Sequence, residues 1–167
     1  NVNYKVMEQK SLNLEMKDMD KQKRTAVIAH AIYDEMDRIR DIGRRGMFTK
    51  SWKENKEDIS FYLNHNDETS PGRVVNVFDD EHKAYTEVKM GTHTLGEDTL
   101  IMMDEGIIKK ASFGFITEKK NFINIKGLKA RELKEVQHLE TSVLTKIPCH
   151  PKAGVVTVTK SLEFKKL

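Results

Sequence analysis

The sequence has almost no cysteine and no long apolar segment. Its 167 residues contain a single cysteine, Cys149, which excludes an intrachain disulfide and leaves packing to hold the fold together. No apolar run approaches the roughly 20 residues of a membrane-spanning helix, and the N-terminus lacks the apolar core of a signal peptide. These absences predict a soluble protein in a reducing, intracellular setting with no membrane partner.

A segregated basic surface and a metal-binding motif are also absent. The 29 Lys and Arg and the 26 Asp and Glu give a net charge of +3, with both signs mixed from end to end. Because nucleic-acid-binding domains usually concentrate positive charge on one face, no direct nucleic-acid partner is predicted. Five histidines show no recognised ligand spacing, so no metal or other cofactor is expected; they are His30, His82, His93, His138 and His150.

Short apolar and alternating segments predict a domain of mainly β-structure. The length is about that of one domain. Residues 25–33 form a short apolar run rich in β-branched side chains, which indicates a buried strand. The pattern predicts further strands at 59–65, 74–78, 84–90, 107–115, 132–144 and 155–159, an acidic turn at 79–81, an exposed loop at 34–46 and a polar excursion at 121–129.

Two helices are expected beside these strands. Residues 47–52 predict a short helix whose aromatic side chains face the core. Thr94 and Glu97 match a capping box, in which a hydroxyl and a carboxylate each bond a free backbone amide at the start of a helix. Gly106 is placed to end that helix. The chain would thus pass from a helix of about three turns into the strand that carries Ser112.

These elements divide the chain into three parts. Residues 1–24 are expected to form an N-terminal arm or an edge strand, 25–159 the folded domain, and 160–167 a lysine-rich tail. No internal repeat is visible. The fold class predicted is α+β, with β-structure predominant.

Ser112 is the residue on which the chemistry depends. It lies in the strand-like segment 107–115, where the backbone would hold its hydroxyl rigidly, and Gly114 would leave room for a substrate chain. A serine becomes a nucleophile only with a general base within hydrogen-bond reach and a third group that orients the base. On its own, Ser112 fits an inert strand serine better than a nucleophile.

His65 and Glu140 are the candidate base and orienting acid, because each falls on a strand face that also carries apolar residues. Strand alternation predicts that His65 ends an inward-facing row and that Glu140 shares a face with His138. The two rows are Ile59, Phe61, Leu63, His65 and Val136, His138, Glu140, Ser142, Leu144. Two inert readings stay open: a satisfied structural histidine and a solvated strand carboxylate.

Short motifs along the chain resemble, in order and spacing, the prohead proteases of tailed phages. In that family a histidine lies in an N-H-D-like turn, a serine in an S-x-G-F strand, and an acid in an E-x-S-x-x-T strand ahead of a proline loop. The matching segments, within residues 25–158, are Asp41-Ile42-Gly43, Gly46-Met47-Phe48, His65-Asn66-Asp67, Pro71-Gly72, Asp98 with Gly106, 111–115, 133–136, and 140–145 followed by Pro148.

The chain departs from the family pattern at two places. A glycine usually precedes the aspartate where this chain has Arg40-Asp41-Ile42, and P-A-N-P is usual where it has Pro148-Cys149-His150-Pro151. Neither departure falls on the histidine, serine or acid motif.

The resemblance implies a serine endopeptidase related in fold to the herpesvirus assemblins, an antiparallel β-barrel with flanking helices. Such an enzyme acts inside the assembling prohead in the host cytoplasm. It cleaves scaffold or the scaffold-like arm of the capsid protein, and also itself, so its partners would be capsid protein and scaffold; a homo-oligomer is compatible. By motif, Ser112 would be the nucleophile, His65 the general base and Glu140 the acid that orients it, with oxyanion donors sought in 145–151.

Three alternatives stay open. The assemblins use a second histidine as third member, which would place His138 in the role of Glu140. Cys149 beside His150 suggests a thiol enzyme, although adjacent residues on an extended chain point in opposite directions. The whole domain is also compatible with a non-catalytic scaffold or capsid-assembly module in which the three site residues are inert.

Overall fold

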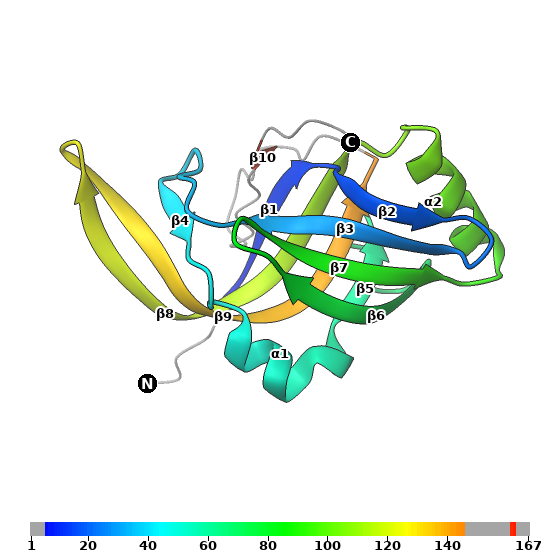
Figure 1. Cartoon of the computed structure of the whole chain (residues 1–167), viewed down its shortest axis with the longest axis horizontal. Coiled ribbons are helices and arrows are strands. Elements are labelled where there is room, and N and C mark those ends of the chain that lie inside the picture. The colour runs from blue at the N-terminus through cyan, green and yellow to red at the C-terminus, as the bar shows by residue number, and fades with distance from the viewer. Residues whose placement is uncertain (1–5, 146–160, 163–167) are drawn as a thin grey trace.

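The computed structural model describes residues 6–145 and 161–162 and shows mainly strands, with two short helices at the periphery (Figure 1). The elements are β1 (Met7–Asn13), β2 (Met16–Asp20), β3 (Thr25–Ile32), β4 (Asp41–Gly43), α1 (Thr49–Asn55), a 3-10 turn η1 (Lys56–Asp58), β5 (Ser60–Leu63), β6 (Gly72–Asp79), β7 (Lys83–Met90), α2 (Thr94–Asp104), β8 (Lys110–Ile125), β9 (Leu128–Leu144) and β10 (Ser161–Leu162). The predicted mainly β, α+β class is confirmed.

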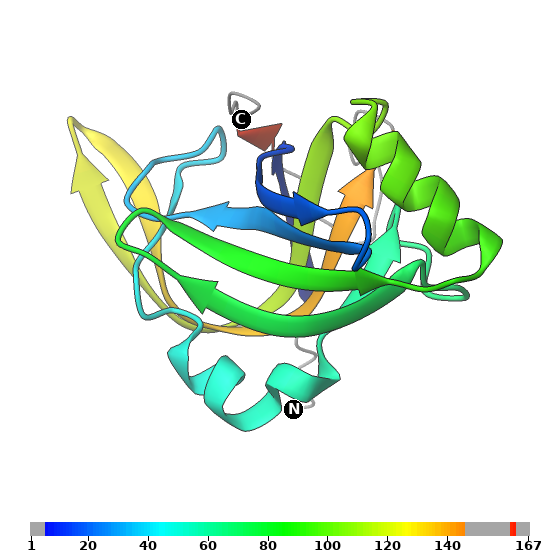
Figure 2. The ribbon, with the colours of Figure 1, turned by 45° about the vertical axis from the view of Figure 1, so that its right-hand side comes forward.

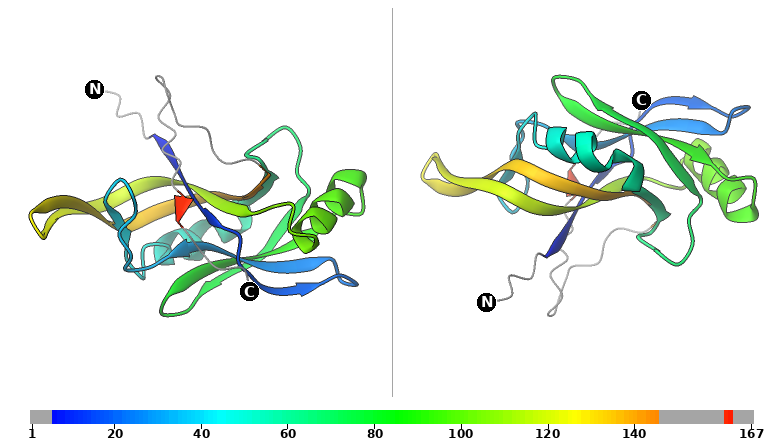
Figure 3. Two further views of the ribbon diagram at one scale, coloured as in Figure 1. Left: turned by 90° about the horizontal axis from the view of Figure 1, so that it is seen from above. Right: turned by 90° about the horizontal axis from the view of Figure 1, so that it is seen from below.

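The strands form two sheets that lie one over the other (Figure 3). The first has the order β10-β1-β8-β9-β4, and β5 also pairs with β9; the second has the order β2-β3-β7-β6. The pairs β1 with β10, β4 with β9 and β5 with β9 are parallel. The described strands therefore form no closed antiparallel β-barrel, because the sheets do not join edge to edge and three pairings run in parallel.

The core lies between the sheets and decides which side chains face outward. On β8, Ala111, Phe113 and Phe115 are buried against residues of β3 and β7. On β9, the Thr141 hydroxyl lies 2.9 Å from that of Thr86 on β7, so Thr141 also faces the second sheet. Strand alternation then turns Ser112 to the opposite, outer face of the first sheet.

Local sequence patterns predicted the core-facing aromatic side chains of α1 and the end of α2, but not the start of α2. The aromatic side chains at α1 do face the core, where Phe48 and Trp52 stack with ring centroids 5.0 Å apart. α2 stops just before Gly106, whose φ of 73° is a conformation that favours glycine. The capping box is wrong, because Thr94 already occupies the first helical position and the cap residue before it, His93, makes no side-chain cap hydrogen bond.

The β8–β9 hairpin is longer than its sequence suggested. The segment predicted as a polar excursion continues both strands, and a two-residue turn at Lys126 and Gly127 joins them with φ of 49° and 81°. The tip projects from one end of the molecule, and α2 lies at the other end (Figures 1 and 2). Both faces of this ribbon meet solvent, so no apolar alternation marks it.

Other predicted segments have mixed outcomes. The strands expected at 25–33, 74–78 and 84–90 form β3, β6 and β7, and the loop 34–46 contains the short strand β4. Part of the N-terminal 1–24 segment forms β1 and β2, with β1 between β8 and β10. The strand predicted at 155–159, together with Cys149 and His150, lies outside the described residues.

Candidate active site

A row of three serines crosses the outer face of the first sheet at the predicted nucleophile. Ser112 on β8 is paired with Ser11 on β1 and with Ser142 on β9. All three residues are fully buried. Directly opposed residues have Cβ atoms about 5 Å apart. Within the described part of the chain, the hydroxyls of Ser11 and Ser112 have no hydrogen-bond partner.

The carboxylate of Glu140 lies one row further along the same face. Glu140 is paired with Gly114 on β8 and with Ser60 on β5. The Ser142 hydroxyl donates to Glu140 Oε2 at 2.5 Å, and Glu140 Oε1 lies 2.6 Å from Nδ1 of His65. Only 6% of the Glu140 side chain is exposed, so these two bonds compensate its burial.

Gly114 makes the room that this carboxylate occupies. A Cβ atom built on Gly114 would lie 2.8 Å from Glu140 Oε1 and 2.9 Å from Glu140 Cγ, closer than real Cβ contacts. The space was expected to serve a substrate chain. It is filled instead by the side chain of Glu140.

His65 was predicted to end an inward-facing row of strand residues, and that prediction is wrong. The residue reaches Glu140 through a turn. β5 ends at Leu63; Asn64 and His65 then adopt φ of 54° and 58°, and Asn66 N–H donates to the Leu63 carbonyl at 3.1 Å. Two central residues with positive φ and this closing bond are the features of a type I′ turn. The turn breaks the alternation of the strand and brings His65 to the outer face.

The imidazole of His65 has a bonded nitrogen, Nδ1, and a second nitrogen, Nε2, that faces no partner in the described part of the chain. With Nδ1 held by the carboxylate, the neutral ring carries its proton there and presents Nε2 as an acceptor. Nε2 is buried and has no hydrogen-bond partner among the described residues, as is also true of the Ser112 hydroxyl. Buried polar atoms without partners are rare and call for an explanation. Here a potential donor and a potential acceptor occur at the same patch of the sheet.

His138 does not share a face with Glu140, so that prediction is wrong. The register of β8 and β9 shifts between Gly114, opposite Glu140, and Phe115, opposite His138, so that Leu139 is an extra residue in β9. Such a bulge turns the residues on its two sides to opposite faces. His138 accordingly faces the core, 2% exposed.

The contacts of His138 are structural. Its Nδ1 accepts from the Trp52 indole N–H at 3.1 Å, and its Nε2 lies 3.0 Å from the Thr141 hydroxyl. The Thr141 hydroxyl is also hydrogen-bonded to the Thr86 hydroxyl, and the Thr86 hydroxyl lies 2.8 Å from Nδ1 of His30. Burial lowers the pKa of His138 to about 3. Burial, and secondarily His138, lowers the pKa of His30 well below its ordinary value. Both rings are thus neutral members of a buried chain of hydrogen bonds.

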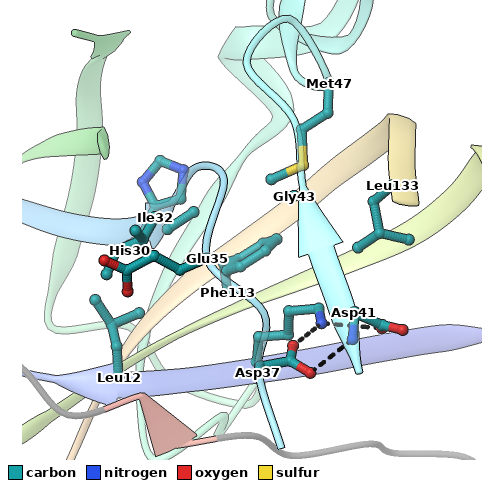
Figure 4. Close-up of a pocket in the computed structure, with 12 residues that line it drawn as sticks. Leu12, His30, Ile32, Glu35, Asp37, Asp41, Gly43, Met47, Phe113 and Leu133 are labelled. Carbon is teal, nitrogen blue, oxygen red and sulfur yellow. Dashed lines mark hydrogen bonds and ion pairs between the residues drawn. The ribbon is translucent and has the colours of Figure 1, made fainter. Parts of the chain in front are cut away.

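A small cavity lies on the inner side of the first sheet, away from Ser112 (Figure 4). Its volume of about 20 Å³ has room for one water molecule. At its rim, Lys10 Nζ lies 2.6 Å from Asp37 Oδ2 and 3.0 Å from Asp41 Oδ2, with both carboxylates almost fully buried. These ion pairs tie β1 to the segment around β4, and the cavity is too small for a substrate.

Among residues 6–145 and 161–162, no group of three or more His, Cys, Asp and Glu side chains is placed to hold a metal ion. No helix in that part of the chain is long and apolar enough to cross a membrane.

A buried serine next to a histidine–carboxylate pair, on a mainly β fold, defines a candidate serine hydrolase as a class. A family model described as caudovirus prohead serine protease matches residues 11–166. The chain therefore belongs to the prohead serine protease family of tailed phages, which confirms the resemblance in the motifs.

Similarity to a solved structure supports the fold. The bacteriophage T4 capsid assembly protease superposes with a TM-score of 0.62 at 10% sequence identity, over 85% of this chain and 99% of that one. At this identity the likeness shows the fold alone. No curated protein sequence matches the chain.

Sequence reasoning missed the residues that support the histidine and the carboxylate. Ser142 bonds Glu140, and Thr145 bonds Asn64, the residue before His65. Ser142 and Thr145 are the serine and the threonine of the E-x-S-x-x-T motif, so the signal was present in the spacing. What the spacing alone did not give was the partner of each hydroxyl.

Proposed function

We propose that this serine protease is an endopeptidase that cleaves scaffold or capsid-protein arms, and itself, during prohead maturation, with Ser112, His65 and Glu140 as its catalytic triad. One observation carries the proposal: Nδ1 of His65 is bonded to Glu140, while Nε2 of His65 and the hydroxyl of Ser112 have no hydrogen-bond partner among the residues that the structure describes. Family membership supports the protease class.

The chemistry follows from these groups. Nε2 of His65 takes the proton of the Ser112 hydroxyl as its oxygen attacks the scissile carbonyl, and the imidazolium that forms is stabilised by Glu140. His65 then protonates the leaving amine, which departs and leaves an acyl ester on Ser112. Water, deprotonated by the same ring, hydrolyses the ester. Ser142 keeps the other oxygen of Glu140 occupied, so the carboxylate presents a fixed atom to His65.

Several finer predictions belong to the same proposal. The oxyanion donors are expected in 145–151, of which the described residues include only Thr145. Capsid protein and scaffold are the expected substrates, and the name of the T4 capsid assembly protease is consistent with this. The assemblin relationship, a homo-oligomer, the lack of a nucleic-acid partner, the location in the host cytoplasm, and a domain at 25–159 flanked by an arm and a tail stay predictions.

A second candidate function is a non-catalytic scaffold or capsid-assembly module on this fold. The complete burial of Ser112 favours it, since a nucleophile must be reached by its substrate. The protease hypothesis requires that the outer face be uncovered when substrate binds.

Ser112→Ala tests the proposal. Co-expressed with the capsid protein, the wild-type chain should give capsid-protein fragments, and Ser112→Ala should give none. The matched control is Ser11→Ala, a buried serine in the same row to which no catalytic step is assigned; it should keep the wild-type fragments. If Ser112→Ala gives the wild-type pattern while circular dichroism shows both variants folded, the protease assignment to Ser112 fails and the assembly module is favoured.

A further inference from the structure

We infer that Asn64 and Thr145 form a clamp that positions His65, which makes Asn64 a positioning residue of the protease. The inference rests on the proposed triad. It concerns two exposed side chains that lie beside the site without contacting the reacting atoms. Its basis is the backbone of the turn that carries His65, together with the hydrogen bonds that hold that turn to the end of β9.

The turn places His65 in a conformation that its side chain disfavours. Types of turn with positive φ at both central residues prefer asparagine at the first and glycine at the second. Asn64 fits the first position, at φ of 54°, but His65 occupies the second, at φ of 58°. A residue held in a sparsely populated region of backbone conformation persists only where its surroundings enforce it.

The clamp provides that enforcement. Asn64 Oδ1 accepts the backbone N–H of Thr145 at 2.8 Å, and Asn64 Nδ2 donates to the Thr145 hydroxyl at 2.8 Å. The backbone N–H of Asn64 also donates to the Val143 carbonyl at 2.9 Å. These bonds fix Asn64 to the end of β9, the strand that also carries Glu140 and Ser142.

The consequence is a fixed geometry between His65 and its carboxylate. Glu140 lies on β9, and Thr145 directly follows the last residue of that strand, five positions after Glu140. The clamp therefore sets the position of the ring relative to the acid. If the turn relaxed to extended backbone, strand alternation would carry the His65 side chain to the other face, away from Glu140. The segment E-x-S-x-x-T would thus supply the acid, the hydroxyl that orients it, and the hydroxyl that anchors the histidine turn.

The first experiment compares two asparagines of one loop. Asn64→Ala should lower kcat on a capsid-protein junction peptide by about 100-fold with little change in KM, since misplacement of a catalytic group by about 1 Å costs a factor of that order. Asn64→Asp, which keeps an acceptor for the Thr145 N–H and tolerates positive φ, should recover part of that loss. Asn66→Ala is the matched control, because among the described residues the Asn66 side chain bonds only the nearby Glu68 N–H, and alanine keeps the backbone bond from residue 66 to Leu63; its kcat should equal that of wild type.

The second experiment does not depend on catalysis. In the Ser112→Ala background, the proton between His65 Nδ1 and Glu140 should give a low-field imidazole signal by NMR, assigned by its loss in His65→Gln. Asn64→Ala should remove the signal and Asn66→Ala should keep it. If Asn64→Ala keeps both the signal and wild-type kcat, the positioning role is overturned. If Ser112→Ala still cleaves, the triad is wrong, while the signal still reports whether the clamp holds His65.

Discussion

Replacing Gly114 by alanine should inactivate the protease while leaving the fold intact. The new methyl carbon would lie 2.8 Å from Glu140 Oε1, 2.9 Å from Glu140 Cγ and 3.2 Å from Glu140 Cδ. Ordinary van der Waals contact begins near 3.4 Å, so the carboxylate oxygen must retreat by 3.4 − 2.8, about 0.6 Å. The atom that moves is the one bonded to His65 at 2.6 Å.

The expected loss of rate is about 100-fold, or about 2.7 kcal/mol at 1.36 kcal/mol per factor of ten. Stability should change much less. Alanine in a strand gains roughly 0.5–1 kcal/mol over glycine by reducing the entropy of the unfolded chain, and this offsets part of the cost of displacing Glu140. The free energy of unfolding should therefore stay within about 2 kcal/mol of wild type, a range typical of single substitutions.

The assay measures kcat/KM on a peptide that spans a junction identified by mass spectrometry of wild-type products, with urea unfolding in parallel. Gly127→Ala is the control for the rate, because its Cβ would meet open space at the far tip of the same hairpin; its kcat/KM should be unchanged, although its φ of 81° disfavours alanine and should lower the free energy of unfolding. Since Gly114→Ala acts through Glu140, the double variant with Glu140→Gln should be no slower than Glu140→Gln alone. A wild-type rate for Gly114→Ala, or losses that multiply in the double variant, would refute the reasoning.

Four further predictions follow from the same contacts. Glu140→Gln should lower kcat by about 10²–10⁴-fold, whereas folded His138→Ala should retain most of its activity; the opposite ranking in peptide assays would move the orienting role to His138. Ser142→Ala should lower kcat by about tenfold, one hydrogen bond to a charged group, and a rate equal to wild type would contradict its role in holding Glu140. Burial lowers the pKa of His138 to about 3, so below pH 6.5 the unfolded chain binds more protons than the folded chain. The contribution of His138 to stability is full above pH 6.5, and the free energy of unfolding should fall by about 1.4 kcal/mol per pH unit from there toward pH 3. Urea unfolding of His138→Gln should show a smaller slope; an equal slope would contradict this assignment. Lys10→Met should lower the free energy of unfolding by about 3 kcal/mol, because it leaves the buried Asp37 carboxylate without this cation; an unchanged urea midpoint would exclude that contribution.

Local patterns in the sequence predicted the elements whose environment is set within a few residues. β3 is a short apolar run, and β7 alternates between buried and partly exposed positions, so burial on one or both faces is written into the order of residues. The helix stop at Gly106 is likewise local, since positive φ favours glycine. The motifs further gave the family, because their order along the chain is itself a pattern.

Contacts between distant segments were not predictable in this way. Lys10 and Asp41 lie 31 positions apart and form a buried ion pair, although a charged residue read by itself is expected at the surface. Gly114 looked like space for a ligand because nothing in the sequence shows that the side chain of Glu140 fills it. In each case the deciding partner comes from another strand.

The two errors about which sheet face His65 and His138 occupy share one cause, which also explains how the site is assembled. A prediction from strand alternation assumes that successive side chains always point to opposite faces of the sheet. The site depends on two places where this alternation is interrupted. The extra residue Leu139 separates the faces of His138 and Glu140, and the turn at Asn64 moves His65 from the inner to the outer face. Without both interruptions, strand alternation would direct His65 and His138 away from their observed places. The chain therefore brings its acid and its histidine together by departing from regular strands, and the residues that enforce those departures should be as sensitive to substitution as the catalytic residues they serve.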